Sequence, residues 1–145
     1  MTRRMAVAVA SLLGVFVSAY LWLHKIGVIG TLVCSTGGCE TVQFSPYSLF
    51  LGIDVALIGL LGYVVLLLVS LVAIHPAQAD ARGPVVVLLG LSAGAVLFTA
   101  RLKYLEFFVI GAVCQWCVVS AVLITVIFVL AVLEYRRCLL RRPHE

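Results

Sequence analysis

The chain has 145 residues, of which 64% are apolar and 11% are charged, and its mean hydropathy is +1.24. An apolar share this large exceeds that of soluble globular domains, so the composition predicts an integral membrane protein and excludes a soluble enzyme. We attribute the net charge of +4 to the lysine and arginine residues that orient a membrane protein in the bilayer, and we therefore expect no nucleic-acid partner.

Four apolar segments follow one another along the chain, each about as long as a helix needs to cross the hydrocarbon core of a bilayer. We expect transmembrane helices over about residues 5–23, 47–74, 84–102 and 114–134. These segments predict an all-α fold, a single membrane domain over residues 1–145 that forms a four-transmembrane-helix bundle. The first segment has a second interpretation as a cleaved signal peptide, because Arg3-Arg4 precedes it and Val17-Ser18-Ala19 resembles a cleavage site.

The loop between the first two segments holds a pair of cysteines, Cys34 and Cys39. Gly37 and Gly38 lie between them, and glycines allow the tight backbone that a short disulfide loop requires. Taken alone, this pair predicts a structural disulfide as readily as a redox-active one.

The second segment is preceded by Ser45-Pro46, which has the pattern of a helix N-cap followed by proline at the first helical position. We therefore expect the second helix to begin here. Asp54 would then lie inside this helix near its outer end. An ionisable group within a membrane helix usually faces the bundle interior or marks a functional site.

The third segment ends at a polar break made of Arg101, Lys103 and Glu106, next to aromatic residues that suit the membrane interface. Gly90 and Gly94 lie four residues apart within this segment, a spacing typical of close packing between membrane helices. We expect the glycines to serve packing and the polar break to connect the third helix to the fourth.

A C-x-x-C sequence, Cys114 to Cys117, opens the last apolar segment. Both thiols are expected in the first turn of the helix and on the same face. Free N–H groups and the positive end of the helix dipole favour the thiolate there. Two such cysteines can form a redox disulfide, hold a metal ion or pack as small apolar side chains.

Lysine and arginine are divided unevenly between the two ends of the expected bundle. With four helices both termini lie on one side, and that side collects seven of the ten basic residues: Arg3, Arg4, Arg82, Arg136, Arg137, Arg141 and Arg142. The positive-inside rule therefore predicts cytoplasmic termini, with both cysteine pairs at the extracytoplasmic face, where disulfides are permitted. Cys138, in the basic tail, is expected to be a reduced bystander.

Two cysteine pairs at one membrane face suggest electron transfer by disulfide exchange, in which a thiolate attacks a disulfide sulfur. A pair on a loop can move and meet dithiols in water. A pair fixed at a helix end can lie against an acceptor dissolved in lipid. A quinone suits the role of acceptor, because it is apolar and takes up two electrons.

Together these features resemble the vitamin K epoxide reductase family, and its bacterial members most of all. The resemblance rests on the cysteine pair of the first outer loop, on Ser45 six residues after Cys39 and on the C-x-x-C at the last helix. It includes the pattern Gly52…Gly59…Gly62-Tyr63 and covers nearly the whole chain from Cys34 onward.

The resemblance implies a quinone-dependent disulfide oxidoreductase of the bacterial inner membrane that supports disulfide bond formation. Cys34 and Cys39 match the family's shuttle pair, which exchanges disulfides with a thioredoxin-fold partner on the outer side. Cys114 and Cys117 match its active pair, in which Cys114 is attacked from Cys39 and Cys117 lies next to the quinone, a menaquinone or a ubiquinone. Ser45 matches the serine near the quinone headgroup.

The chain departs from the family pattern at three points. Many bacterial members carry a fused thioredoxin-like domain, which this chain lacks, so the partner is expected to be a separate protein. Asp54 stands where bacterial members usually have proline, and it is a candidate for proton handling or quinone contact. Ala121 stands where animal members have a tyrosine, which favours quinone reduction over epoxide reduction.

Other interpretations are compatible with the same residues. A non-enzymatic membrane assembly factor would use Cys34–Cys39 as a structural disulfide and bind no quinone, and a quinone-epoxide reductase would use both pairs. The other bacterial quinone-linked four-helix oxidase, of the Dsb type, has its two pairs in the reverse order. A four-cysteine zinc site lacks a supporting histidine–cysteine pattern and conflicts with an oxidising outer face, so we expect no metal.

Overall fold

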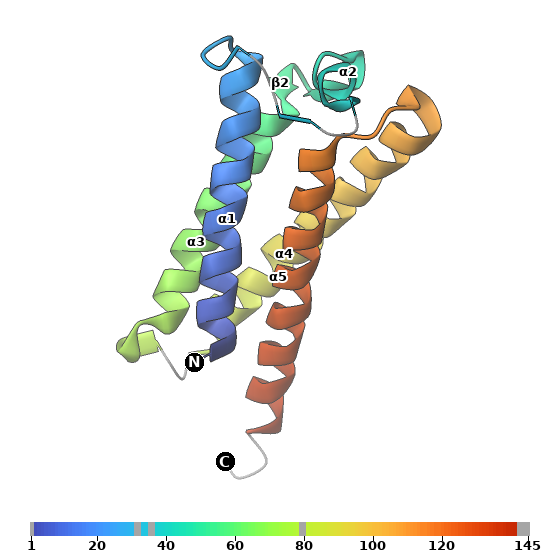
Figure 1. Ribbon diagram of the computed structural model, residues 1–145. Helices are drawn as coiled ribbons and strands as arrows, with labels where there is room; N and C mark the ends of the chain where they lie inside the picture. The colour runs from blue at the N-terminus through green and yellow to red at the C-terminus, as the bar shows by residue number, and fades with distance from the viewer. Residues whose placement is uncertain (1, 31–32, 35–36, 79–80, 142–145) are drawn as a thin grey trace.

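Four long helices form the structure (Figure 1), a computed structural model that describes residues 2–30, 33–34, 37–78 and 81–141. They are α1 (Thr2–Lys25), α3 (Val55–Ile74), α4 (Gly83–Tyr104) and α5 (Gln115–Leu140). All four are long and apolar enough to cross a membrane, with α4 extended to Ile110 by a π-helix, η3 (Leu105–Ile110). The expected bundle of four transmembrane helices is confirmed.

The helix α1 packs along α3 on one side and α5 on the other, while α4 packs on α5 and contacts α3 less extensively. The chain termini lie at one end of the bundle, and the segment between α1 and α3 lies at the other (Figure 1). The core consists of small and branched apolar side chains from all four helices: Val7, Ala10, Tyr63, Leu66, Ala73, Leu88, Ile124, Ile127 and Ala131. The helix α1 is thus an integral part of the packed bundle.

Tyr63 of α3 connects three helices, because it contacts both α5 and α1. Its hydroxyl donates a hydrogen bond of 2.8 Å to the carbonyl of Ser120 in α5 and lies 2.9 Å from the Ser120 hydroxyl. Its ring occupies the space beside Gly14 of α1, where any Cβ atom would overlap the ring atoms. The absence of a side chain at Gly14 therefore allows α1 to approach α3 closely.

The expected start of the second helix is wrong. Residues 45–54 instead form a short 3₁₀ turn, η1 (Pro46–Ser48), and a two-stranded antiparallel hairpin of β1 (Leu49–Phe50) and β2 (Ile53–Asp54). The hairpin loop consists of Leu51 and Gly52, both with positive φ (55° and 81°), as type I′ turns require. Only after this hairpin does α3 begin, at Val55.

The residue that caps α3 is Asp54 and not Ser45. The Asp54 side chain accepts a hydrogen bond of 2.9 Å from the N–H of Ala56, as an N-cap residue does. Ser45 makes no cap bond, and its hydroxyl donates to the carbonyl of Val42 at 2.9 Å. Asp54 therefore does not lie inside a membrane helix, because the hairpin moves the helix start eight residues along the chain.

The helix was also expected to end at the polar residues after residue 102, but the helical structure continues through them. The helix α4 continues through Arg101 and Lys103, and the π-helix η3 carries the chain to Gly111, whose φ of 72° ends it. At the opposite end, α5 extends through the basic residues to Leu140, beyond the expected limit of 134. Lysine and arginine are good helix formers, and their long side chains reach the interface from within a helix.

The Gly14 contact with Tyr63 yields a prediction for stability. Gly14→Ala should destabilise the bundle by about 1–3 kcal/mol, because the added methyl group overpacks the α1–α3 contact. We expect a lower midpoint of thermal unfolding in detergent. Gly90→Ala in α4 is the matched control, since a Cβ at Gly90 meets no atom within 4 Å; equal behaviour of the two variants would contradict the packing argument.

Candidate active site

The loop cysteines form a disulfide, Cys34–Cys39, at the end of the bundle opposite the chain termini. Cys39 is the first residue of a short helix, α2 (Cys39–Gln43). Cys39 is fully buried, whereas Cys34 is partly exposed. A thiol arriving from water therefore reaches the Cys34 sulfur more readily than the Cys39 sulfur.

The C-x-x-C cysteines are both reduced and lie at the start of α5. Cys114 is the N-cap of the helix, one residue before the first turn in which it was expected, and its sulfur accepts the N–H of Cys117 at 3.4 Å. The hydrogen bond from the Cys117 thiol is the main cause that lowers the pKa of Cys114, against a smaller opposing effect of burial. Cys114 is thus favoured to ionise.

A contact between backbones brings the two pairs together. Gly38 packs so closely on Val113 that a Cβ at Gly38 would overlap the Val113 carbonyl oxygen and lie 2.9 Å from its nitrogen. The next residues in each segment are Cys39 and Cys114, and both have no exposed surface. The two buried cysteines therefore adjoin the closest point between the loop and the start of α5.

A second contact fixes the other side of the disulfide loop. The indole N–H of Trp116, within the C-x-x-C, donates a hydrogen bond of 2.7 Å to the carbonyl of Val33. The N–H of Val33 donates to the Tyr20 hydroxyl at 3.1 Å, and the Tyr20 and Trp116 rings meet edge to face. Sequence reasoning missed both aromatic residues, although a tryptophan between the two cysteines was visible in the sequence.

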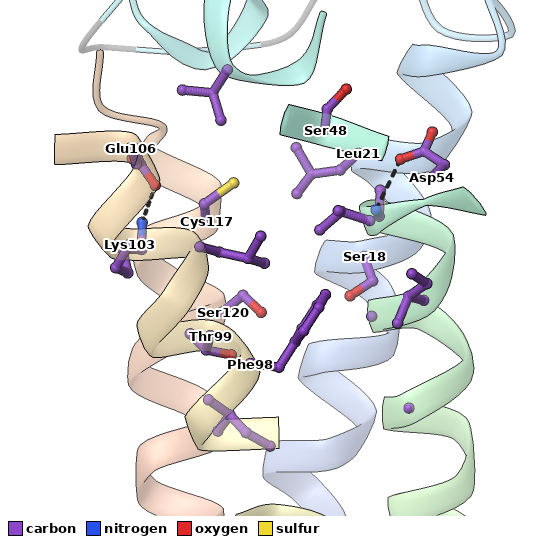
Figure 2. Close-up of a pocket in the computed structure, with 18 of the residues that line it drawn as sticks. Ser18, Leu21, Ser48, Asp54, Phe98, Thr99, Lys103, Glu106, Cys117 and Ser120 are labelled. Carbon is purple, nitrogen blue, oxygen red and sulfur yellow. Dashed lines mark hydrogen bonds and ion pairs between the residues drawn. The ribbon is translucent and has the colours of Figure 1, made fainter. Parts of the chain in front are cut away.

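A cavity of about 360 Å³ lies among the helices directly below this junction (Figure 2). Its walls come from all four long helices, and α2 contributes Val42 and Gln43. Cys117 lines the cavity, and its side chain points into it in Figure 2. Of the other expected site residues, Ser45 and Asp54 also line it, whereas Cys114 is not part of the lining.

Polar groups lie on two opposing sides of this cavity (Figure 2). On the side of α1 and the hairpin, Lys25 donates a hydrogen bond of 2.6 Å to the Ser48 hydroxyl and forms an ion pair of 3.5 Å with Asp54. On the side of α4 and α5, Lys103 and Glu106 form an ion pair of 2.7 Å next to Cys117.

Glu106 is the main site residue that sequence reasoning missed. Its side chain is 3% exposed, and its carboxylate accepts a hydrogen bond of 2.5 Å from the N–H of Cys114. From the sequence, Glu106 was expected in the polar break between the third and fourth helices, next to interfacial aromatic residues. The available sign was a carboxylate within an otherwise apolar stretch, eight residues before a C-x-x-C.

The cavity suits a flat apolar ring with polar substituents. Its volume falls within the range of small-molecule sites, and its deeper walls are apolar, with polar groups confined to a few positions. Tyr63, Ile124 and Leu66 belong to the apolar part of the lining, and Ser120 and Cys117 supply polar atoms. The site residues present fit the headgroup of a quinone.

The comparison with known families agrees with this geometry. The model of the vitamin K epoxide reductase family matches residues 5–132. The match extends from α1 into α5 and includes the disulfide loop, the hairpin, the π-helix and the C-x-x-C. The chain belongs to the vitamin K epoxide reductase family, whose members are membrane oxidoreductases that act on thiols and quinones.

Proposed function

We propose that this protein reoxidises an extracytoplasmic thioredoxin-fold protein and passes the electrons to a membrane quinone, thereby supporting disulfide bond formation. One observation carries the proposal: a disulfide on a surface loop adjoins a second cysteine pair whose inner member lines an apolar cavity. A structural disulfide in an assembly factor would not need a second, reduced cysteine pair beside it.

The first step is exchange with the partner. A thiolate of the reduced partner attacks the sulfur of Cys34, and the Cys39 sulfur leaves as a thiolate. The second thiol of the partner then attacks the partner's first sulfur, the one bonded to Cys34 in the mixed disulfide, and Cys34 leaves as a thiol. The partner is now oxidised by two electrons, and the loop pair is reduced by two.

The second step transfers the electrons within the chain. The Cys39 thiolate attacks Cys114 of an oxidised Cys114–Cys117 pair, and Cys117 leaves as a thiolate in the cavity wall. Cys34 then attacks Cys39, which restores the loop disulfide and releases Cys114. The outcome is a Cys34–Cys39 disulfide beside two reduced thiols, and this is the redox state of the structure.

The electron acceptor is a menaquinone or a ubiquinone, which as a substrate takes up two electrons and two protons. Ser45 and Asp54 are proposed to bind its headgroup, because both line the cavity into which Cys117 points. Asp54 does so while capping α3 and pairing with Lys25, so its carboxylate is fixed in position. The free thiols of Cys114 and Cys117 supply these two electrons and two protons. In doing so they form the Cys114–Cys117 disulfide that the second step requires, with the Cys117 sulfur next to the quinone.

To test this function, purified protein in detergent is mixed with dithiothreitol and a short-chain ubiquinone or menaquinone, and the absorbance of the quinone is followed. The wild-type protein should reduce the quinone at a catalysed rate, and Cys117→Ser should return this rate to that of dithiothreitol alone. Cys138→Ser is the control, because Cys138 lies at the other end of α5. Undiminished reduction by Cys117→Ser would refute the assignment.

The orientation in the membrane is part of the proposal. Arginine residues gather at the end of the bundle that carries the termini, and this favours a cytoplasmic location for that end. A membrane-impermeant maleimide added to intact cells should therefore leave Cys138 unmodified and label it only after permeabilisation. Labelling of Cys138 in intact cells would reverse the orientation.

The contact of Gly38 with Val113 predicts a specific loss of transfer. Gly38→Ala should slow partner-driven quinone reduction about tenfold or more, because the methyl group pushes Cys39 away from Cys114. Reduction of the C-x-x-C by a small dithiol should persist. Gly30→Ala, in the same loop but with no atom within 4 Å of its Cβ, should transfer electrons normally, and a Gly38→Ala protein at the wild-type rate would contradict the contact's role.

A further inference from the structure

A buried ion pair next to the C-x-x-C has no part in the steps described so far. The side chain of Glu106 is 3% exposed and that of Lys103 is 17% exposed. The two carboxylate oxygens of Glu106 have different partners: Oε1 accepts the N–H of Cys114 at 2.5 Å, and Oε2 contacts the Lys103 ammonium at 2.7 Å. The pair is therefore joined directly to the backbone of an active cysteine.

The backbone between Glu106 and Cys114 brings these two residues together. The π-helix η3 carries Glu106, and Gly111 closes it by donating its N–H to the Glu106 carbonyl at 3.0 Å in a left-handed conformation. The chain thereby turns back so that the Glu106 side chain meets Cys114, eight residues later. Short π-helical segments are frequent at functional sites.

A carboxylate buried this deeply is costly unless it is paired and fully hydrogen-bonded. A helix start needs only a neutral acceptor for its free N–H groups, and a serine or an asparagine would provide one. The presence of two opposite charges, where one neutral group would suffice for capping, points to a role for charge beside the Cys114 sulfur.

We propose that Lys103 and Glu106 are a positioning pair that fixes the Cys114 backbone and balances the charge beside its sulfur, and so sets the reduction potential of the Cys114–Cys117 couple. The inference rests on the proposed function only in taking this pair of cysteines as a redox couple. Glu106 opposes a thiolate at Cys114 by charge repulsion, and Lys103 favours it by attraction.

The other charged groups around Cys114 are few among the described residues. Cys117 faces it from α5, and Lys103 and Glu106 face it from the end of α4 and from η3. The helix α2 brings Cys39, which is held in a disulfide, and Glu40. The Glu40 side chain is 64% exposed and lies 3.7 Å from His24, so water screens its charge.

Neutralising each partner separately distinguishes charge from structure. Glu106→Gln keeps an oxygen that accepts the Cys114 N–H and removes the negative charge, so the reduced form gains stability and the disulfide becomes more oxidising. Lys103→Gln removes the positive charge and should make the disulfide less oxidising. Both variants abolish the same ion pair, so a purely structural role predicts that both shift in the same direction.

The experiment equilibrates detergent-purified protein with mixtures of reduced and oxidised glutathione at pH 8, without oxygen or added quinone. The reaction converts one protein disulfide and two glutathione thiols into two protein thiols and one glutathione disulfide. After acid quenching, alkylation and peptide mass spectrometry give the reduced fraction at Cys114 and Cys117.

We expect the equilibrium constant for reduction to rise about threefold or more in Glu106→Gln and to fall by a similar factor in Lys103→Gln. The double variant should return close to the wild-type value, and Lys103→Arg, which keeps the charge, should match the wild type. Glu40→Gln, an exposed neutralisation, should change nothing.

Shifts of Glu106→Gln and Lys103→Gln in the same direction, or no shift in either, would overturn the proposal. If Lys103→Gln fails to fold, the sign of the shift in Glu106→Gln decides: a rise in the equilibrium constant for reduction supports the role of charge, and a fall or no change would overturn it. The glutathione equilibrium involves neither partner nor quinone. A wild-type protein that did not reduce quinone would therefore refute the proposed function separately.

Discussion

Disulfide exchange requires that the reacting sulfur atoms come into contact. In this protein, contact between the two cysteine pairs depends on the junction of the disulfide loop with the start of α5. The loop with Cys34–Cys39 is exposed to water, whereas the C-x-x-C begins a membrane helix. The packing of Gly38 on Val113 joins these two environments, since it brings the backbone before Cys39 against the backbone before Cys114. The bond from Trp116 to Val33 holds the same loop from its other side.

The burial of the four cysteines is graded in a way that suits one route for electrons. Cys34 is partly exposed, Cys39 and Cys114 have no exposed surface, and Cys117 lines the cavity. Each successive sulfur can therefore be reached mainly from its neighbour in the route. The charged groups of the cavity lie near the end opposite the chain termini, where ion pairs fix Asp54 and Glu106, whereas the hydroxyls of Ser18, Thr99 and Ser120 line it further down. The cavity therefore offers polar groups to the headgroup of a quinone and apolar walls to the rest of the molecule.

Much of this arrangement could be predicted from the sequence, because apolar length and the spacing of cysteines are strong local patterns. The four helices followed from hydrophobic segments alone. The hairpin at residues 49–54 could not be predicted, because a positive φ is rare at a leucine and Leu51-Gly52 is not among the residue pairs that favour a two-residue turn. For the same reason Ser45 was taken as a helix cap in place of Asp54. Glu106 was missed because its partner, the N–H of Cys114, is supplied by tertiary structure.

The central claim is that electrons pass between the pairs through the sulfurs of Cys39 and Cys114. The most direct measurement is the mapping of disulfides in Cys117→Ser protein, in which an intermediate bond to Cys114 has no resolving thiol within the C-x-x-C. After oxidation in the presence of the reduced partner, peptide mass spectrometry should find a Cys39–Cys114 disulfide and a free Cys34. A disulfide from Cys34 to Cys114, or no bond between the two pairs, would contradict the account.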